Sequence, residues 1–293
     1  MRVLNAFKTV LLLVLLSAIF LGIGYMIGGQ SGMLFAFLMS LVMNFGAYWF
    51  SDKIVLAMHK AQPIKRGDPS GVYEIVEGLC YRAKLPMSKV YLIPEGTPNA
   101  FATGRNPNNA AVAATEGIVR ILNKKELCRV LAHEMAHIQN RDILISTIVA
   151  TIASAIMYLA HMLQWVGMTG NSHGGREGGR GIHPVVMLVT IILAPLVATL
   201  VQAAVSRSRE FMADESGAQI SQDPEALAAA LEKISNPALQ KRFQKDDMLP
   251  DMQPAFAHLY IVNHFSDESI MRWFSTHPPV KERVKRLLSM KRS

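Results

Sequence analysis

The chain has 293 residues, of which 51% are hydrophobic and 18% charged, with a mean hydropathy of +0.23. Soluble domains carry about 25% charged residues, so this composition favours a membrane protein. The net charge of +8 is compatible with nucleic acid, an anionic membrane or the charge bias of membrane topology. Two cysteines exclude a disulfide framework.

Long apolar runs without Asp, Glu, Lys or Arg are the first elements in chain order. They cover residues 9–28, 31–50, 144–166 and 184–205. About 20 apolar residues cross the hydrocarbon core of a bilayer, so we expect four transmembrane helices in two hairpins. A cleaved signal peptide is the alternative for the first run. No cleavage-site pattern precedes the second run, which favours a turn at residues 28–30.

The distribution of basic residues predicts the orientation of these helices. Lysine and arginine follow the second and fourth runs, whereas the 167–183 loop holds only Arg176 and Arg180. Because cytoplasmic loops are enriched in Lys and Arg, both termini and the segments 51–143 and 206–293 should be cytoplasmic.

The segments between the hairpins show mixed helix and strand patterns. Ser70 is a candidate cap for the first helix, and Asn123 with Glu126 resembles a capping box. The expected helices are 71–84, 124–140, 224–235 and one after Pro279, and the expected strands are 89–93, 99–103 and about 110–114. The fold class is therefore mainly α with a small β-sheet.

The motif that indicates chemistry is His133-Glu134-Met135-Ala136-His137 within the 124–140 helix. Residues four apart share one helical face, so both imidazoles can bind one metal ion. Glu134 is placed to take a proton from a metal-bound water and return it to the leaving amine. Two histidines, one carboxylate and an open position are typical of catalytic zinc, which predicts one Zn²⁺ per chain.

A third ligand is expected just after the fourth apolar run. Glu210 and Asp214 again lie four residues apart, so Glu210 could bind the metal while Asp214 accepts a hydrogen bond from a ligand histidine. An antiparallel hairpin of the third and fourth runs would bring this segment level with His137. Pairing of the two carboxylates with Arg207 and Arg209 is the alternative.

These motifs resemble the HtpX family of membrane zinc metalloproteases, which belongs with the CAAX prenyl protease in the gluzincin class. The resemblance extends to the 98–104 and 276–279 segments and to both hydrophobic hairpins. It implies zinc binding by His133, His137 and Glu210, with Glu134 as catalytic base and Asp214 as a support. It further implies an ATP-independent, stress-induced endopeptidase of the bacterial cytoplasmic (inner) membrane that acts in protein quality control on misfolded membrane proteins and is prone to self-cleavage.

The domain organisation follows from these assignments. Residues 1–50 form the first transmembrane hairpin and 143–205 the second, while 51–142 and 206–293 form the two parts of a membrane-anchored, zincin-like cytoplasmic protease domain.

Two further assignments concern substrate and transition state. The strand at Asn99, Ala100 and Phe101 could lie beside the zinc as an edge that an extended peptide joins by main-chain hydrogen bonds. An ordinary edge strand is the alternative. His277 and Arg283 could stabilise the oxyanion of the tetrahedral intermediate, or could belong to a solvated, Pro-capped helix start.

Other functions remain as alternatives. A CAAX-type processing protease would use the same motif, but it implies prenylated substrates. A non-catalytic membrane scaffold or holdase with a metal site would normally close the zinc with four protein ligands. An intramembrane site conflicts with the polar segment 139–142, and dispersed basic residues give nucleic-acid binding little support.

Overall fold

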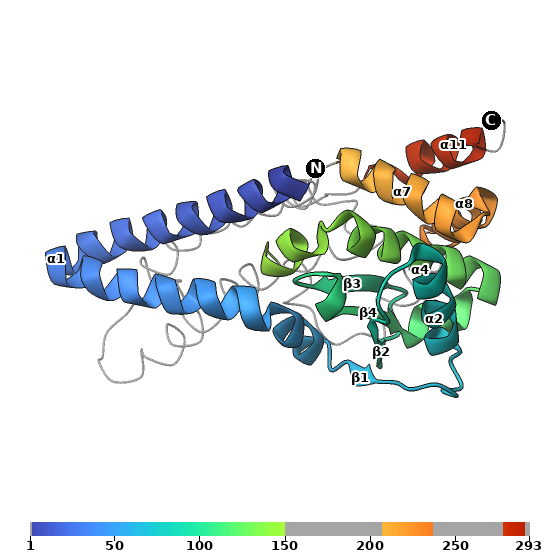
Figure 1. The fold of residues 1–293 in the computed structure, drawn as a ribbon, viewed down its shortest axis with the longest axis horizontal. Coiled ribbons are helices and arrows are strands. Elements are labelled where there is room, and N and C mark those ends of the chain that lie inside the picture. Colours follow the sequence, from blue (N-terminus) through green and yellow to red (C-terminus); the bar gives the residue numbers. More distant parts are fainter. Residues whose placement is uncertain (1, 150–206, 237–277, 291–293) are drawn as a thin grey trace, which may run out of the picture.

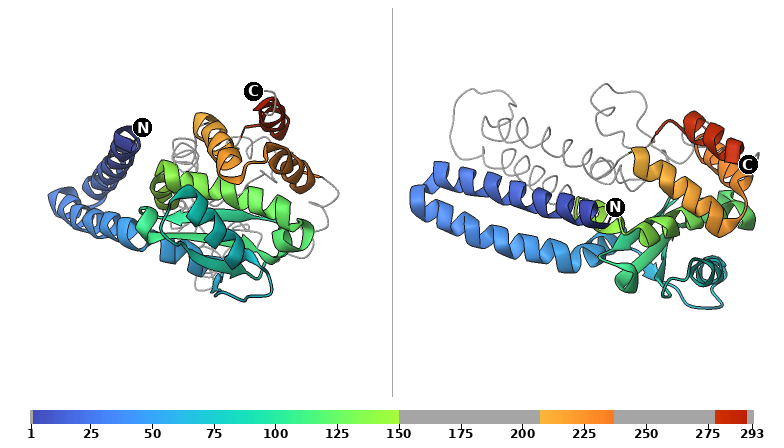
Figure 2. Two further views of the ribbon diagram at one scale, coloured as in Figure 1. Left: turned by 45° about the vertical axis from the view of Figure 1, so that its right-hand side comes forward. Right: turned by 45° about the horizontal axis from the view of Figure 1, so that its top comes forward.

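The first element is α1 (Arg2–Met58), which consists of two helical limbs joined by a sharp turn (Figure 1). The computed structural model describes residues 2–149, 207–236 and 278–290. The limbs meet at Gly28 (φ −135°, ψ 18°) and Gly29 (φ 59°, ψ −141°), neither of which is helical. Gly29 lies in the left-handed region, where the absence of a Cβ matters. The expected turn at residues 28–30 is therefore confirmed, and the right-hand view of Figure 2 shows the two limbs running back from this turn as a hairpin.

Close packing holds the two limbs together. A Cβ at Gly32 would collide with the carbonyl oxygen of Gly24, so the backbones can approach only because both residues are glycine. Asn44 Nδ2 donates a hydrogen bond to Ser17 Oγ on the other limb at 2.8 Å. An interhelical hydrogen bond between apolar limbs fixes their register.

One segment within the described residues, Gly28–Met58, is long and apolar enough to cross a membrane by length and composition. Its outward apolar side chains are exposed, as for a helix that faces lipid. The predicted second hairpin, 144–166 and 184–205, lies outside the described residues apart from 144–149. The expectation of four spans therefore stays a prediction.

A small mixed sheet follows α1. Its strands are β1 (Gln62–Pro63), β2 (Lys89–Ile93), β3 (Ala100–Gly104) and β4 (Ala110–Thr115), in the order β1-β2-β4-β3. β2 and β4 are parallel, and the other two pairs are antiparallel. The three longer strands match the sequence prediction to within about one residue at each end, and β3 lies at an edge of the described sheet.

The helices around the sheet confirm the mainly helical fold. They are α2 (Val72–Ala83), the short η1 (Pro107–Asn109), α3 (Glu116–Ile121), α4 (Lys124–Asn140), α7 (Arg207–Ser221), α8 (Pro224–Ile234) and α11 (Val280–Met290). The capping box of α4 is present: Asn123 Oδ1 accepts from the amide of Glu126, and Glu126 Oε2 accepts from the amide of Asn123. The N-cap residue of α2 is Gly71, in the left-handed conformation, rather than Ser70, but Ser70 Oγ accepts a hydrogen bond from the amide of Val72, the first helical residue, at 3.4 Å.

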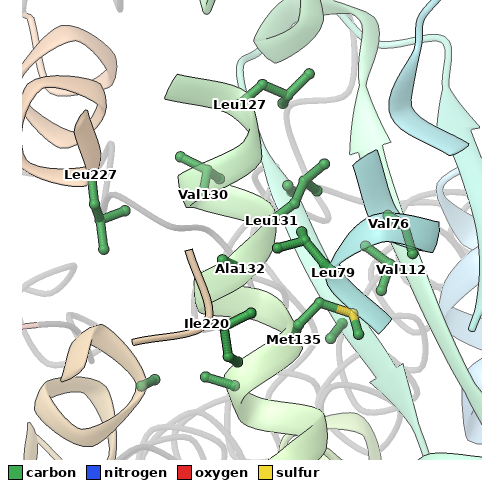
Figure 3. Packing of buried hydrophobic residues seen from close by; sticks show 14 of the residues in the cluster. Val76, Leu79, Val112, Leu127, Val130, Leu131, Ala132, Met135, Ile220 and Leu227 are labelled. Carbon is green, nitrogen blue, oxygen red and sulfur yellow. The ribbon is translucent and has the colours of Figure 1, made fainter. Parts of the chain in front are cut away.

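α4 is the centre of the hydrophobic core (Figure 3). Leu131 and Met135, both fully buried, face α2 and the sheet, where they meet Leu79. Leu227 of α8 and Ile220 of α7 lie on the opposite side of α4. Because α4 is enclosed on both sides, His133 and Glu134 of the motif are buried as well and need partners inside the protein.

Candidate metal centre

The HExxH motif lies on α4, whose helical spacing brings its two histidines together. The Nε2 atoms of His133 and His137 are 3.3 Å apart. His133 is 2% exposed, and its ring meets that of His137 edge to face, with the centroids 4.9 Å apart. Both Nε2 atoms therefore face one common point.

α7 brings Glu210 to that same point. One carboxylate oxygen of Glu210 lies 3.7 Å from His133 Nε2, and the other lies 3.7 Å from His137 Nε2. The ligand atoms of the three residues all lie within 4.8 Å of one another. The structure thus brings the three predicted ligands together from two helices.

Gly217 allows this close approach of α7 to α4. A Cβ at Gly217 would lie 2.9 Å from the Cα of His133 and 3.0 Å from its amide nitrogen. Both are backbone atoms that cannot turn aside, so only glycine fits. Gly217 lies seven residues after Glu210 on the same helical face, and it therefore sets the depth at which Glu210 and Asp214 sit. Gly217 was not among the predicted site residues.

Each of the two histidines has a carboxylate next to Nδ1, the ring nitrogen that is not directed at Glu210. Asp214 Oδ1 lies 2.9 Å from His133 Nδ1, as expected for Asp214. Asp142 Oδ2 lies 3.1 Å from His137 Nδ1. Such carboxylates orient the ring and leave Nε2 free for a metal. Asp142 was predicted only as part of a polar segment; its position just after the Arg141 C-cap, five residues from His137, was the available signal.

Arg283 on α11 contacts the carboxylate of Asp214. Its Nε donates to Asp214 Oδ2 at 2.9 Å and its Nη2 donates to Oδ1 at 2.6 Å, and the residue is 1% exposed. Nη2 also lies 3.5 Å from His133 Nδ1. Arg283 thus pairs with Asp214, the carboxylate that contacts the predicted ligand His133. A role for Arg283 at the oxyanion stays a prediction. His277 lies outside the described residues.

Glu134 is buried beside the histidine pair, 7% exposed. Its Oε2 accepts a hydrogen bond from the amide of Ala102 in β3 at 3.1 Å. Burial raises the pKa of Glu134, while the adjacent imidazoles His133 and His137 oppose that rise. A carboxylate with a raised pKa is a stronger base than an exposed one and is better suited to accept a proton.

The charges of the centre are strongly coupled. Burial by itself would lower the pKa of both histidines, but their carboxylate partners outweigh it and the pKa of each is raised, for His137 to about 10. Burial would raise the pKa of Asp214, yet Arg283 and His133 hold it down at about 2. The metal-free site therefore holds protons on imidazoles that a metal ion would displace.

The predicted substrate strand lies where the sequence placed it, one residue shifted. β3 adjoins Glu134, but two of its outward amides are already used: that of Ala102 by Glu134, and that of Gly104 by Thr147 Oγ1 at 3.2 Å. Phe101 points to the other side of the sheet, where it packs with Val55 of α1. Asn99 and Ala100 are also buried. Addition of a peptide strand here stays a prediction.

Arg209 is a buried cation next to the centre. It is 6% exposed, and its guanidinium nitrogens have no hydrogen-bond partner within the part of the chain that the structure describes. Burial lowers its pKa, while the carboxylates of Asp142 and Glu210 oppose that effect. The alternative pairing of Asp214 with Arg209 is not seen, because Asp214 is paired with Arg283.

The donor set fits a divalent metal ion. The two Nε2 atoms and the Glu210 carboxylate converge, and both opposite ring nitrogens face carboxylates, as in histidine-liganded zinc sites. Three protein ligands with an adjacent buried glutamate match a catalytic site rather than a closed structural one. The fold and site thus define a metallopeptidase of the HExxH class.

Comparisons with known proteins agree with that class. The chain belongs to Peptidase family M48, whose model matches residues 70–291, and it is a metalloprotease. A protease HtpX homolog of Syntrophobacter fumaroxidans is 51% identical over 98% of this chain and 99% of its own length. Homologs of the same name from Syntrophotalea carbinolica and Burkholderia mallei are 49% and 48% identical, over 98% and 99% of this chain and 99% and 98% of their own lengths.

The crystal structure of S. mikatae Ste24p is among the solved structures that are similar to this chain. The match covers 98% of this chain and 66% of that chain, with 18% identity and a TM-score of 0.49. At that distance the likeness transfers no activity and no residue role.

Proposed function

We propose that the chain is a zinc-dependent, ATP-independent endopeptidase of the bacterial inner membrane that cleaves cytoplasmic segments of misfolded membrane proteins. The observation that carries this proposal is the position of Glu134, buried beside two histidines whose Nε2 atoms converge with the Glu210 carboxylate. Zinc and its ligands, the membrane orientation and the substrate class are all parts of this proposal.

Each residue of the centre has a defined task in this mechanism. His133, His137 and Glu210 would hold zinc, which supplies Lewis-acid polarisation of the peptide carbonyl and activation of water. Glu134 takes the proton of the attacking water and passes it to the nitrogen of the leaving amine. The Ala102 amide orients the Glu134 carboxylate for both transfers. Asp214 and Asp142 keep the two imidazoles turned with Nε2 toward the ligand point.

The position of the end of α1 favours substrates that lie close to the membrane surface. After Lys8, no Asp, Glu, Lys or Arg occurs in the sequence before Asp52. Val55, three residues later, is fully buried against Phe101 of β3, the strand that contacts Glu134. Three helical residues rise about 5 Å, so the strand next to the site begins just beyond the apolar stretch. Segments that emerge from a bilayer are therefore within reach.

A cleavage assay with the purified full-length chain tests the catalytic part. The chain in detergent with zinc is mixed with unfolded casein, and Glu134→Gln is compared with the exposed control Glu215→Gln. We expect Glu134→Gln to retain its zinc and lose cleavage by about 10²–10⁴-fold, because it removes the base but no ligand. Normal cleavage by Glu134→Gln would refute the mechanism. Self-cleavage should occur in the zinc-loaded chain and stop on chelation.

A second assay tests the substrate class. One unfolded segment is placed either directly after a membrane span or at the end of a soluble protein, and both reporters are added to the chain in liposomes. We expect the membrane-attached segment to be cleaved faster. Equal rates for both would support a general endopeptidase and contradict the membrane-protein assignment.

A further inference from the structure

A pocket of about 280 Å³ lies where the second limb of α1 meets the start of β2, the start of β4 and the residue after β3. Its basic wall consists of Lys53 from α1, Lys89 at the start of β2 and Arg105 directly after β3. Its aromatic wall consists of Trp49 and Phe50. Three segments distant in sequence therefore place their cations around one cavity.

The charge of this pocket is not balanced from within. Asp52 is the one acidic residue that lines it. Within the described ranges, no ion pair involves Lys53, Lys89 or Arg105. Arg105 instead stacks over the Trp49 ring, 4.2 Å from its centroid, which leaves its positive charge in place. An anion is the ligand that such a pocket favours.

The pocket lies at the boundary between apolar and charged parts of α1. Val42, Phe45 and Trp49 occupy one helical face at spacings of three and four, and all three are exposed. An exposed apolar stripe therefore leads along the helix directly to the pocket. Aromatic residues that end an apolar helix are typical of the membrane–water interface.

We propose that this pocket binds the phosphate of an anionic membrane phospholipid, with Lys53, Lys89 and Arg105 around the headgroup and the acyl chains along the Val42–Phe45–Trp49 face. The positive-inside bias explains why a lysine, Lys53, follows the span. It does not explain why Lys89 and Arg105 of the sheet line the same pocket as Lys53. The volume fits a headgroup, and the stripe offers the tails an apolar surface. A free phosphate shares the headgroup chemistry but makes no use of that stripe.

Bound lipid would also reach the strand beside the catalytic residue. Arg105 follows Gly104, the last residue of β3, and Ala102 in the same strand donates to the Glu134 carboxylate. Headgroup binding at Arg105 therefore anchors the end of the strand that orients Glu134. The binding itself does not depend on proteolysis.

Lipid binding is measured on the full-length Glu134→Gln chain in detergent, so that cleavage does not interfere. Short-chain phosphatidylglycerol and phosphatidylcholine are titrated and bound lipid is counted by native mass spectrometry. The pocket double variant Lys89→Gln/Arg105→Gln is compared with Lys65→Gln/Arg82→Gln, which removes the same charge from exposed positions outside the pocket. We expect the Kd for phosphatidylglycerol to rise about tenfold or more in the pocket variant alone.

Further measurements decide between the proposal and its alternatives. The charge-preserving variant Lys89→Arg/Arg105→Lys should retain binding, which separates charge from misfolding. Equal weakening in both double variants, or equal binding of phosphatidylcholine, would overturn the proposal in favour of general charge attraction. Displacement of the lipid by inorganic phosphate at a similar concentration would assign the pocket to a free anion instead. Casein cleavage by the chain with Glu134 intact tests the proposed function separately.

Discussion

Arg283 and Asp214 form a bidentate ion pair that is 1–2% exposed, and the same carboxylate contacts His133 Nδ1. The pair links α11 to α7 and, through His133, to α4. A buried carboxylate that serves two cations is fixed in orientation, and so is the imidazole that depends on it. Arg283 therefore acts on the metal centre through Asp214, in addition to any contact it could make with a substrate.

Arg283→Met should lower both the stability of the chain and its zinc affinity, although Arg283 is not a predicted ligand. Breaking a buried ion pair from one side costs about 3–5 kcal/mol, so the free energy of unfolding should fall by that order. Zinc affinity, measured by chelator competition, should fall about 10–100-fold, because His133 loses its fixed orientation. If zinc affinity stayed unchanged while kcat fell, Arg283 would act on the oxyanion instead.

Asp142→Asn should affect the other histidine. The amide keeps the shape but removes the charge that raises the pKa of His137. We expect zinc affinity to fall about 10–100-fold with little change in fold, measured by metal competition and circular dichroism. Glu215→Gln, an exposed carboxylate change on α7, serves as the control. Unaltered zinc affinity in the Asp142→Asn chain would show that Asp142 only gives the His137 ring a hydrogen-bond partner and does not affect metal binding.

Gly217→Ala should push α7 away from α4. The added methyl group meets the backbone of His133, and overpacking of this kind costs about 1–3 kcal/mol. Glu210 moves with α7, so zinc affinity and kcat should both decrease. Gly78→Ala in α2 is the matched control: its Cβ meets nothing within 4 Å, and it should stabilise the chain by about 0.5–1 kcal/mol. Equal behaviour of the two variants would contradict the close-approach argument.

The metal-free chain should lose stability in alkali. The pKa of His137 is about 10 in the fold, above its ordinary value of 6.5, so its protonated form stabilises the fold. That contribution is fully present below pH 6.5 and is lost as the pH rises through 10. The midpoint of thermal unfolding of the chelated chain should therefore fall between pH 7 and pH 10. The zinc-loaded chain should not show this fall, because its imidazoles bind the metal without a proton. A parallel decline in both forms would point to another group.

Local sequence signals were sufficient for α4 and the longer strands. The capping box at Asn123 and Glu126 fixes where α4 begins, and its histidine spacing fixes which face carries the motif. The Glu210 assignment also needed only helical spacing and chain topology. Gly217 and the Arg283–Asp214 pair could not be predicted, because they depend on how closely α7 and α11 approach α4. Tertiary packing decides such contacts, and a single sequence does not contain a local sign of it.

The centre also sets an order of events during synthesis. A separation of 150 positions divides His133 from Arg283. Chains fold from the N-terminal side as they leave the ribosome, so α4 with its complete HExxH motif can form long before α11 exists. Until residue 283 emerges, Asp214 lacks its guanidinium partner and His133 lacks a fixed ring orientation. The contacts that orient His133 are therefore completed only after residue 283 has been made, long after the HExxH motif itself.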